Sequence, residues 1–397
     1  MLNYWWYILI LLLLEEEEKK KEARKHSRYK KTFHNEVLGA GGRQLRQRRI
    51  PRISLLRTAV SPWRKLYHSG NQQALITAMG LSYYAFDYLL SKFTWYFENY
   101  TPFNGRVTKR ANMGRRRRIN AIDCLGLVLV WTRTKGSVYS LQMTFGLSMT
   151  NLCEYLRFGR RIIVQVLKSD EYARVAIPSA EKIEEYKAAI AEKYPVLENV
   201  WATMDGLKLR IQQASTTEKQ ALYYNGWKHD HFVTAVLCFC PDGTIPMAFF
   251  NVPGAQHDST VCELGGIYDK LECVYEETGA VCTVDSAFRV KNAPYLLKSS
   301  QQTFVGEGDT DEEVLHSIQI NRATTSMRQA AEWGMRSLQS SFPRLGDRLV
   351  YEERGERRIM MKMMILLYNF RARLVGINQI KNVYMSSLDE DAEAYLN

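Results

Sequence analysis

The alternation of hydrophobic and polar positions divides the second half of the chain into short buried runs and longer amphipathic stretches. Continuous apolar and β-branched runs predict four strands, at 200–211, 231–240, 244–252 and 280–284. The turn Pro241-Asp242-Gly243 joins the middle two strands into a hairpin. Apolar residues at helical spacing predict two helices, at 259–271 and 322–342. The resulting order of strand, hairpin, helix, strand, loop and helix is typical of a ribonuclease-H-like sheet, so we expect an α/β fold over 196–376.

After the arm, the first half of the chain has apolar positions at helical spacing. Apolar segments at this spacing occupy 75–97, 121–132, 138–145 and 149–167. The short Gly146-Leu147-Ser148 link between the last two predicts a helix-turn-helix-like region over 121–168, with Ser148 as the N-cap of its recognition helix. We therefore expect an all-helical domain at 61–195, between a basic disordered arm at 1–60 and the α/β domain. An acidic tail follows at 377–397.

Positive charge is concentrated toward the amino terminus. The chain of 397 residues has a formal net charge of +12, yet residues 1–120 hold 24 Lys and Arg against 8 Asp and Glu. The remainder holds 30 against 34 and is slightly acidic. This division favours an amino-terminal surface that contacts DNA phosphates, although a solvated arm would carry the same charges. We predict DNA contacts for Arg115, Arg116, Arg117, Arg118, Arg157, Arg160, Arg161 and Lys168.

Residues 1–14 are apolar but too few to span a bilayer, which takes about 20 residues. They also lack the positive start of a signal peptide. We interpret them as a terminal extension and expect no membrane association, with a membrane anchor as the less favoured alternative. The 7 cysteines are odd in number and show no zinc-ligand spacing, which favours a reduced intracellular protein.

Four carboxylates stand where a divalent cation is commonly held against a phosphodiester. They are the strand residues Asp205 and Asp285, the helix-start residue Asp258 and the helix residue Glu332. Mg²⁺ and Mn²⁺ prefer hard oxygen ligands. Two such ions about 3.5–4 Å apart activate the attacking oxygen and stabilise the leaving one. If these acids converge, the protein cuts or joins DNA.

Each acid also has a structural interpretation that stays open at this point. Asp258 precedes a predicted helix and would serve as its N-cap. Glu332 lies four residues from both Arg328 and Arg336 and would pair with them on a solvated face.

Four sequence blocks surround these acids. They are Met204-Asp205-Gly206, Gly254-Ala255-Gln256-His257-Asp258-Ser259, Val284-Asp285-Ser286-Ala287-Phe288 and Arg328-Gln329-Ala330-Ala331-Glu332-Trp333-Gly334-Met335. In this order they resemble the landmark blocks of PIF/Harbinger-type transposases, a branch of the DDE endonuclease superfamily. The resemblance extends from about Leu75 to Gly376.

The resemblance implies a nuclear, metal-dependent endonuclease and strand transferase with Asp205, Asp285 and Glu332 as catalytic acids and Asp258 as an additional acid at or near the metal site. It also implies double-stranded DNA as partner, Mg²⁺ or Mn²⁺ as cofactor, and a Myb-like protein that helps to recognise the transposon ends. Whether the chain forms a homo-oligomer stays open. The alternatives are a domesticated DNA-binding or scaffold protein without catalysis, and a ribonuclease H acting on RNA–DNA hybrids.

Overall fold

A computed structural model describes residues 50–103, 106–109, 117–135, 138–214, 216–288, 293–298, 310–350 and 354–385. Residues 1–49 of the predicted arm, residues 386–397 of the predicted tail, and Arg115 and Arg116 lie outside the described residues. Among the helices of the described part, none is both long and apolar enough to cross a membrane.

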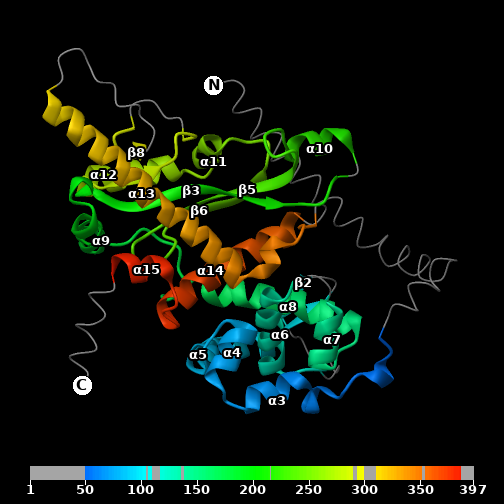
Figure 1. The fold of residues 1–397 in the computed structure, drawn as a ribbon. Helices are drawn as coiled ribbons and strands as arrows, with labels where there is room; N and C mark the ends of the chain where they lie inside the picture. Colours follow the sequence, from blue (N-terminus) through cyan, green and yellow to red (C-terminus); the bar gives the residue numbers. More distant parts are fainter. Residues whose placement is uncertain are drawn as a thin grey trace, which may run out of the picture.

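A six-stranded mixed sheet forms the second half of the molecule (Figure 1). Its strands are β3 (Val200–Arg210), β4 (Tyr224–Asn225), β5 (Asp230–Phe239), β6 (Ala248–Pro253), β7 (Val281–Val284) and β8 (Leu296–Lys298). Their order is β4-β5-β3-β7-β8, and β6 pairs with β5. β3 and β5 are antiparallel, whereas β3, β7 and β8 are parallel neighbours. The strands predicted at 200–211, 231–240 and 280–284 and their order along the chain are confirmed, whereas the strand predicted at 244–252 begins only at Ala248.

Helices pack against this sheet and cover its strands. They are α9 (Ala180–Lys193), η3 (Pro195–Leu197), α10 (Thr217–Tyr223), α11 (Asp258–Leu264), α12 (Ile267–Thr278), α13 (Asp311–Ser341) and α15 (Gln379–Tyr384). α9 lies against β3, α11 against β5, and the long α13 crosses β3, β5 and β7 (Figure 1). α13 begins with a capping box in which Thr310 and Glu313 satisfy each other's backbone amides.

The helix expected over 259–271 is divided in two, which corrects the sequence-based prediction. Gly265 ends α11, and Gly266 takes the left-handed backbone conformation at φ 57°. A residue with a Cβ adopts that conformation only at a cost, so the Gly-Gly pair ends one helix and starts the next. Because the helical spacing of apolar residues continues across Gly265 and Gly266, the spacing alone did not predict this break.

The first half forms a helical part around buried aromatic rings. Its elements are η1 (Arg52–Ser54), η2 (Thr58–Val60), α3 (Pro62–His68), α4 (Gln72–Met79), α5 (Tyr83–Asn99), the hairpin of β1 (Tyr100–Phe103) and β2 (Arg106–Lys109), α6 (Ala121–Arg133), α7 (Tyr139–Phe145) and α8 (Met149–Leu167). Trp63 is fully buried and stacks on Phe145. Gly126 of α6 faces that indole so closely that any Cβ would overlap the ring. The tight contact explains why glycine is accepted inside a helix here.

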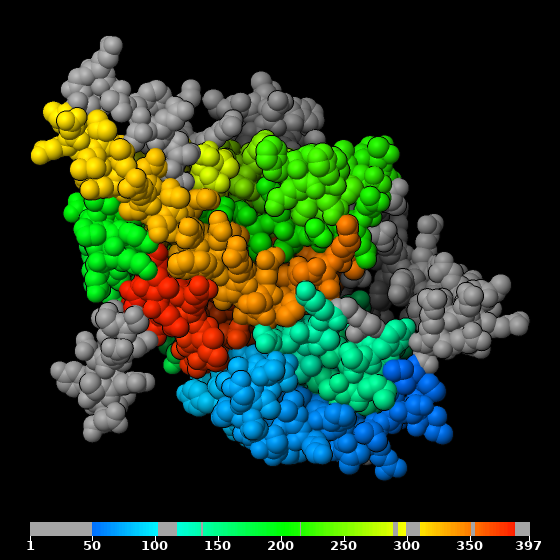
Figure 2. All heavy atoms as spheres, in the orientation of Figure 1, coloured from blue at the N-terminus to red at the C-terminus, as the bar shows by residue number. Residues whose placement is uncertain are grey.

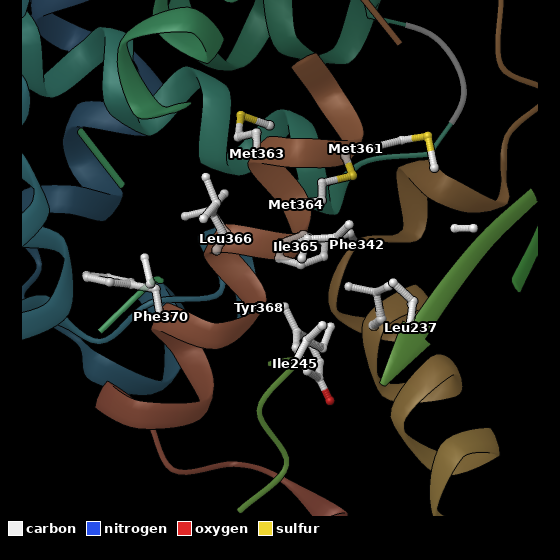
Figure 3. Close-up of a cluster of buried hydrophobic side chains, with 14 of the residues drawn as sticks. Leu237, Ile245, Phe342, Met361, Met363, Met364, Ile365, Leu366, Tyr368 and Phe370 are labelled. Atoms are coloured by element: carbon white, nitrogen blue, oxygen red, sulfur yellow. The ribbon is translucent and has the colours of Figure 1, made fainter. Parts of the chain in front are cut away.

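The helix α14 (Arg354–Leu374) joins the two halves. It packs against α8 on one side and against β6 and α13 on others, and it follows η4 (Pro343–Gly346). Figure 3 shows its side chains Met361, Met364 and Tyr368 beside Leu237 of the sheet and Phe342 at the end of α13. The helical half (blue to teal) and the sheet half (green) meet along the orange and red segments in Figure 2. The buried apolar residues of both halves consequently form one continuous cluster.

Candidate active site

The parallel pairing of β3 with β7 brings the first two acids to the same level of the sheet. Thr203 pairs with Thr283 in this register. Asp205 lies two residues further along β3, and Asp285 immediately follows the last residue of β7. Neighbouring strands lie about 4.8 Å apart, and the charge of Asp285 acts on Asp205, so these two carboxylates are neighbours. The sequence predicted both strands, and the structure supplies the register that unites their acids.

Asp258 approaches Gly206, the neighbour of Asp205 on β3, from the start of α11. A Cβ at residue 206 would lie 2.5 Å from the Cγ of Asp258, so the carboxylate fills the space above Gly206 on β3. His257, rather than Asp258, occupies the N-cap position of α11. The interpretation of Asp258 as the helix cap is therefore wrong: it is the first helical residue, where its charge is favourable next to the helix dipole. Its side chain is left to face the sheet.

The fourth acid, Glu332, stays apart from the three aspartates. It lies on α13, 42% exposed, with Oε2 3.7 Å from Nη2 of Arg336. One turn earlier on the same helix, Arg328 extends to Asp285, with 3.5 Å between Nη1 and Oδ2. The predicted pairing of Glu332 with Arg336 is confirmed, while Arg328 pairs with a strand aspartate instead.

Burial raises the proton affinity of two of these acids. Burial is the largest cause of the raised pKa of Asp205, which reaches about 6, with the negative charges of Asp258 and Asp285 adding to it. The Gly206 amide, which donates to Oδ1 at 2.7 Å, and the Arg328 charge act in the opposite direction. Burial likewise raises the pKa of Asp258, opposed by Lys208, His257 and Lys228. The three aspartates thus lie close enough to influence one another's charge.

The donor set suits a hard divalent cation, although the acids do not surround one point. Among the described residues, no group of three or more His, Cys, Asp or Glu side chains is arranged to hold a metal ion. Yet Oδ1 of Asp258 is buried and accepts no hydrogen bond from any described residue. Lys208 is its nearest cation, with Nζ 3.9 Å away. A buried carboxylate oxygen without a donor is costly, and a cation at that place would satisfy it.

Several arginines predicted to contact DNA have partners within the protein. Three of them, Arg157, Arg160 and Arg161, converge from α8 on Glu356 at the start of α14. Arg160 also lies over the ring of Trp131, 5.0 Å from its centroid.

Arg117 donates to the carbonyl oxygens of Glu98 and Tyr100 and covers the Phe97 ring. Arg118 is exposed, and Lys168 is the C-cap residue of α8. Phosphate contacts by these residues stay predictions. What the structure shows is that four of the arginines hold helices together. Their partners are either an acid far away in the sequence or backbone carbonyl groups, which every residue has. The basic runs alone therefore could not predict that these arginines bind within the protein.

Two basic side chains near the acids were missed by the sequence analysis. Lys208 and Lys228 act on the charge of Asp258 from β3 and from the turn before β5. The signal for Lys208 was its position: it lies on the same strand as Asp205, two residues after Gly206 and on the same face as that glycine. Lys228 had no local signal.

Comparison with known families fits this geometry. Residues 204–369 match the family model described as DDE superfamily endonuclease. The matched stretch runs from β3 into α14 and contains all four acids. Comparison with curated proteins and with solved structures gave no match. The family match supports a transposase-type nuclease domain in this part of the chain, in a superfamily whose members act on DNA and generally use divalent metals.

Proposed function

We propose that this protein is a nuclear, metal-dependent DNA endonuclease and strand transferase of the PIF/Harbinger transposase type, which cuts phosphodiester bonds at transposon ends. The observation that carries the proposal is the β3–β7 register, which places Asp205 beside Asp285 while Asp258 covers Gly206. This arrangement lies within the stretch similar to DDE superfamily endonucleases. Under the proposal the transposon ends are recognised with the help of a Myb-like protein, and a homo-oligomer would pair them.

The three aspartates would hold the divalent cation, and Glu332 would complete the ligand set from α13. When bound, such an ion supplies positive charge at the attacking and leaving oxygens of the phosphodiester. Two cationic side chains would act on the phosphodiester as well. Lys208 lies beside Asp258 and Arg328 beside Asp285, and both would offset negative charge on the scissile phosphate. Attack by water nicks a strand, and attack by a freed 3′-hydroxyl transfers it.

A second candidate is a DNA-binding or scaffold protein without catalysis. The observation that favours it is that two of the four acids are paired with arginines. Glu332 pairs with Arg336, and Asp285 pairs with Arg328. If these pairs persist in solution with metal, the acids stay apart and no phosphodiester is cut. The two candidates therefore differ in one measurable property, cleavage.

The deciding experiment measures nicking of supercoiled plasmid by the purified full chain in Mg²⁺ and in Mn²⁺. We expect cleavage by the wild type and none by Asp205→Asn or Asp285→Asn, because asparagine keeps the shape but loses the charge that holds the ion. Asp269→Asn is the matched control, since Asp269 is an exposed acid on α12 and its loss should leave the rate unchanged. No cleavage by the wild type would favour the non-catalytic candidate, and cleavage confined to RNA–DNA hybrids would indicate a ribonuclease H.

A further inference from the structure

The tight turn between β4 and β5 carries the most exposed tryptophan of the described chain. Trp227 is 90% exposed, whereas the next most exposed, Trp95, is 58% exposed and packs against the rings of Tyr96 and Tyr100. Tryptophan is highly buried on average because its ring is large and apolar. An almost fully solvated indole on a turn is free to stack on a flat ring from outside the chain.

The turn is held firmly at its base. Asn225 pairs with Asp230 across the hairpin, which leaves residues 226–229 as the turn itself. The Asn225 side chain accepts a hydrogen bond from the Lys228 amide at 3.1 Å and donates one to the Gly254 carbonyl at 3.0 Å. Gly254 begins the loop that leads to Asp258. The position of Trp227 is thus tied to the segment that carries one of the candidate metal ligands.

Basic side chains lie between this turn and the acids. Lys208 stands beside Asp258, and the Lys228 charge also reaches that carboxylate. Arg210 follows on the same face of β3 and is 64% exposed. The acid next to Arg210, Asp230, accepts hydrogen bonds from both Nη atoms of Arg348, at 3.0 and 2.8 Å. A positively charged path consequently runs along β3 from Asp258 to the turn.

We propose that this turn is a stacking platform for an unpaired DNA base: the Trp227 indole takes the base, and Lys228 and Lys208 neutralise the phosphates between it and the aspartates. The inference deepens the proposed function and rests on it. Its substrate is DNA that is single-stranded or frayed next to the cleavage point, rather than continuous duplex.

The chemistry favours a base over other occupants. Every base offers a π-face to an aromatic ring, and stacking combined with basic side chains is how proteins hold single strands without reading their sequence. A stable protein partner would instead need roughly 800 Å² of surface on each side, far more than one indole supplies. A base within a duplex already stacks on its neighbours and has no free face for the turn.

Binding measurements in EDTA test this without any dependence on cleavage. The full chain is titrated into two fluorescein-labelled duplexes, one blunt and one with a short unpaired 3′ overhang that contains 2-aminopurine. For Trp227→Ala we expect a loss of about tenfold in affinity for the overhang DNA and little change for the blunt DNA. Trp227→Phe should keep most of the affinity, and 2-aminopurine should be quenched by the wild type but not by Trp227→Ala.

Charge and stacking are separated by the salt dependence. Trp227→Ala should leave the slope of log affinity against log salt unchanged, while Lys228→Met should reduce its magnitude by roughly 0.7. Trp95→Ala and Lys270→Met are the matched controls, since both residues are exposed and lie on helices α5 and α12. Neither control should change affinity for the overhang.

The inference would be overturned by an overhang affinity for Trp227→Ala equal to that of the wild type, by an equal loss on blunt DNA, or by an equal loss in Trp95→Ala. A preference for an RNA overhang over the DNA overhang would also overturn it. These outcomes are distinct from failure of the proposed function, which is a wild type that does not cut plasmid. Trp227 is almost fully exposed, so the variants should unfold at the same temperature as the wild type.

Discussion

Replacing Asp205 by asparagine should make the metal-free protein more stable while it abolishes cleavage. The Asp205 carboxyl is largely buried, and burial raises its pKa from an ordinary value of 3.8 to about 6. This rise in pKa corresponds to about 3 kcal/mol, since a tenfold change in proton affinity is worth about 1.4 kcal/mol. This free energy is the cost of keeping the charge in the fold without a cation. Asparagine has no charge and can still accept the hydrogen bond from the Gly206 amide.

The gain should depend on pH in a defined direction. The unfolded chain loses the Asp205 proton near pH 4 and the folded protein near pH 6, so between these values the unfolded state holds fewer protons. The free energy of unfolding of the wild type therefore falls as pH rises from about 4 to about 6, and above that the full penalty applies. The advantage of Asp205→Asn should be about 3 kcal/mol at about pH 7.5 and should be nearly absent at about pH 4.

Urea unfolding in EDTA at these two pH values measures the advantage, with Asp269→Asn as a variant that should gain nothing at either pH. Added Mg²⁺ should then raise the stability of the wild type at about pH 7.5 and leave that of Asp205→Asn unchanged, because a ligand stabilises only the state that binds it. If Asp205→Asn were less stable than the wild type at about pH 7.5, or equally stabilised at both pH values, the assignment of Asp205 as a desolvated carboxylate would be refuted.

Three further predictions concern the neighbours of Asp205 and the junction of the two halves. Gly206→Ala should lower the cleavage rate at least about tenfold, measured as plasmid nicking, because its Cβ would displace the Asp258 carboxylate; an unchanged rate would show that this position is not critical. Asp258→Ser should raise the Mg²⁺ concentration for half-maximal cleavage by about tenfold or more, since an oxygen donor with its charge is lost, and an equal concentration with an equal rate would leave Asp258 a purely structural role. Glu356→Gln should lower the free energy of unfolding by about 2–3 kcal/mol, because Arg160 and Arg161 would lose their shared acid; urea unfolding would contradict this if the loss were within error of zero.

The sequence was sufficient to predict elements whose causes are local. The helices at 121–132 and 149–167 correspond to α6 (Ala121–Arg133) and α8 (Met149–Leu167), because apolar spacing and a Gly-containing turn act within a few residues. The four strands follow from continuous apolar runs in the same way. The sequence also identified Asp205 and Asp285, because Asp205 interrupts one apolar run and Asp285 follows the end of another.

What the sequence could not supply are contacts between residues far apart along the chain. The filling of the space above Gly206 by Asp258 depends on the path of the loop between β6 and α11, which no local pattern encodes. The convergence of three arginines on Glu356 joins residues separated by 195 positions or more. In both cases the residue type suggested a binding role, but only the three-dimensional structure shows which residue is the partner. For Glu332 the local i,i+4 pairing was the interpretation that the structure bears out.

The placement of α14 has a consequence for modular exchange. Among the described helices only the short α15 follows α14, yet α14 is buried against the helical half through α8 and against the sheet half through β6 and α13. If the chain is divided between α9 and β3, the helical half loses α14, and the apolar surface of α8 that α14 covers becomes exposed. Chimaeras that graft the helical half onto another nuclease would therefore need to carry residues 354–374 with it, and a stop codon ahead of that segment would unmask both halves at once.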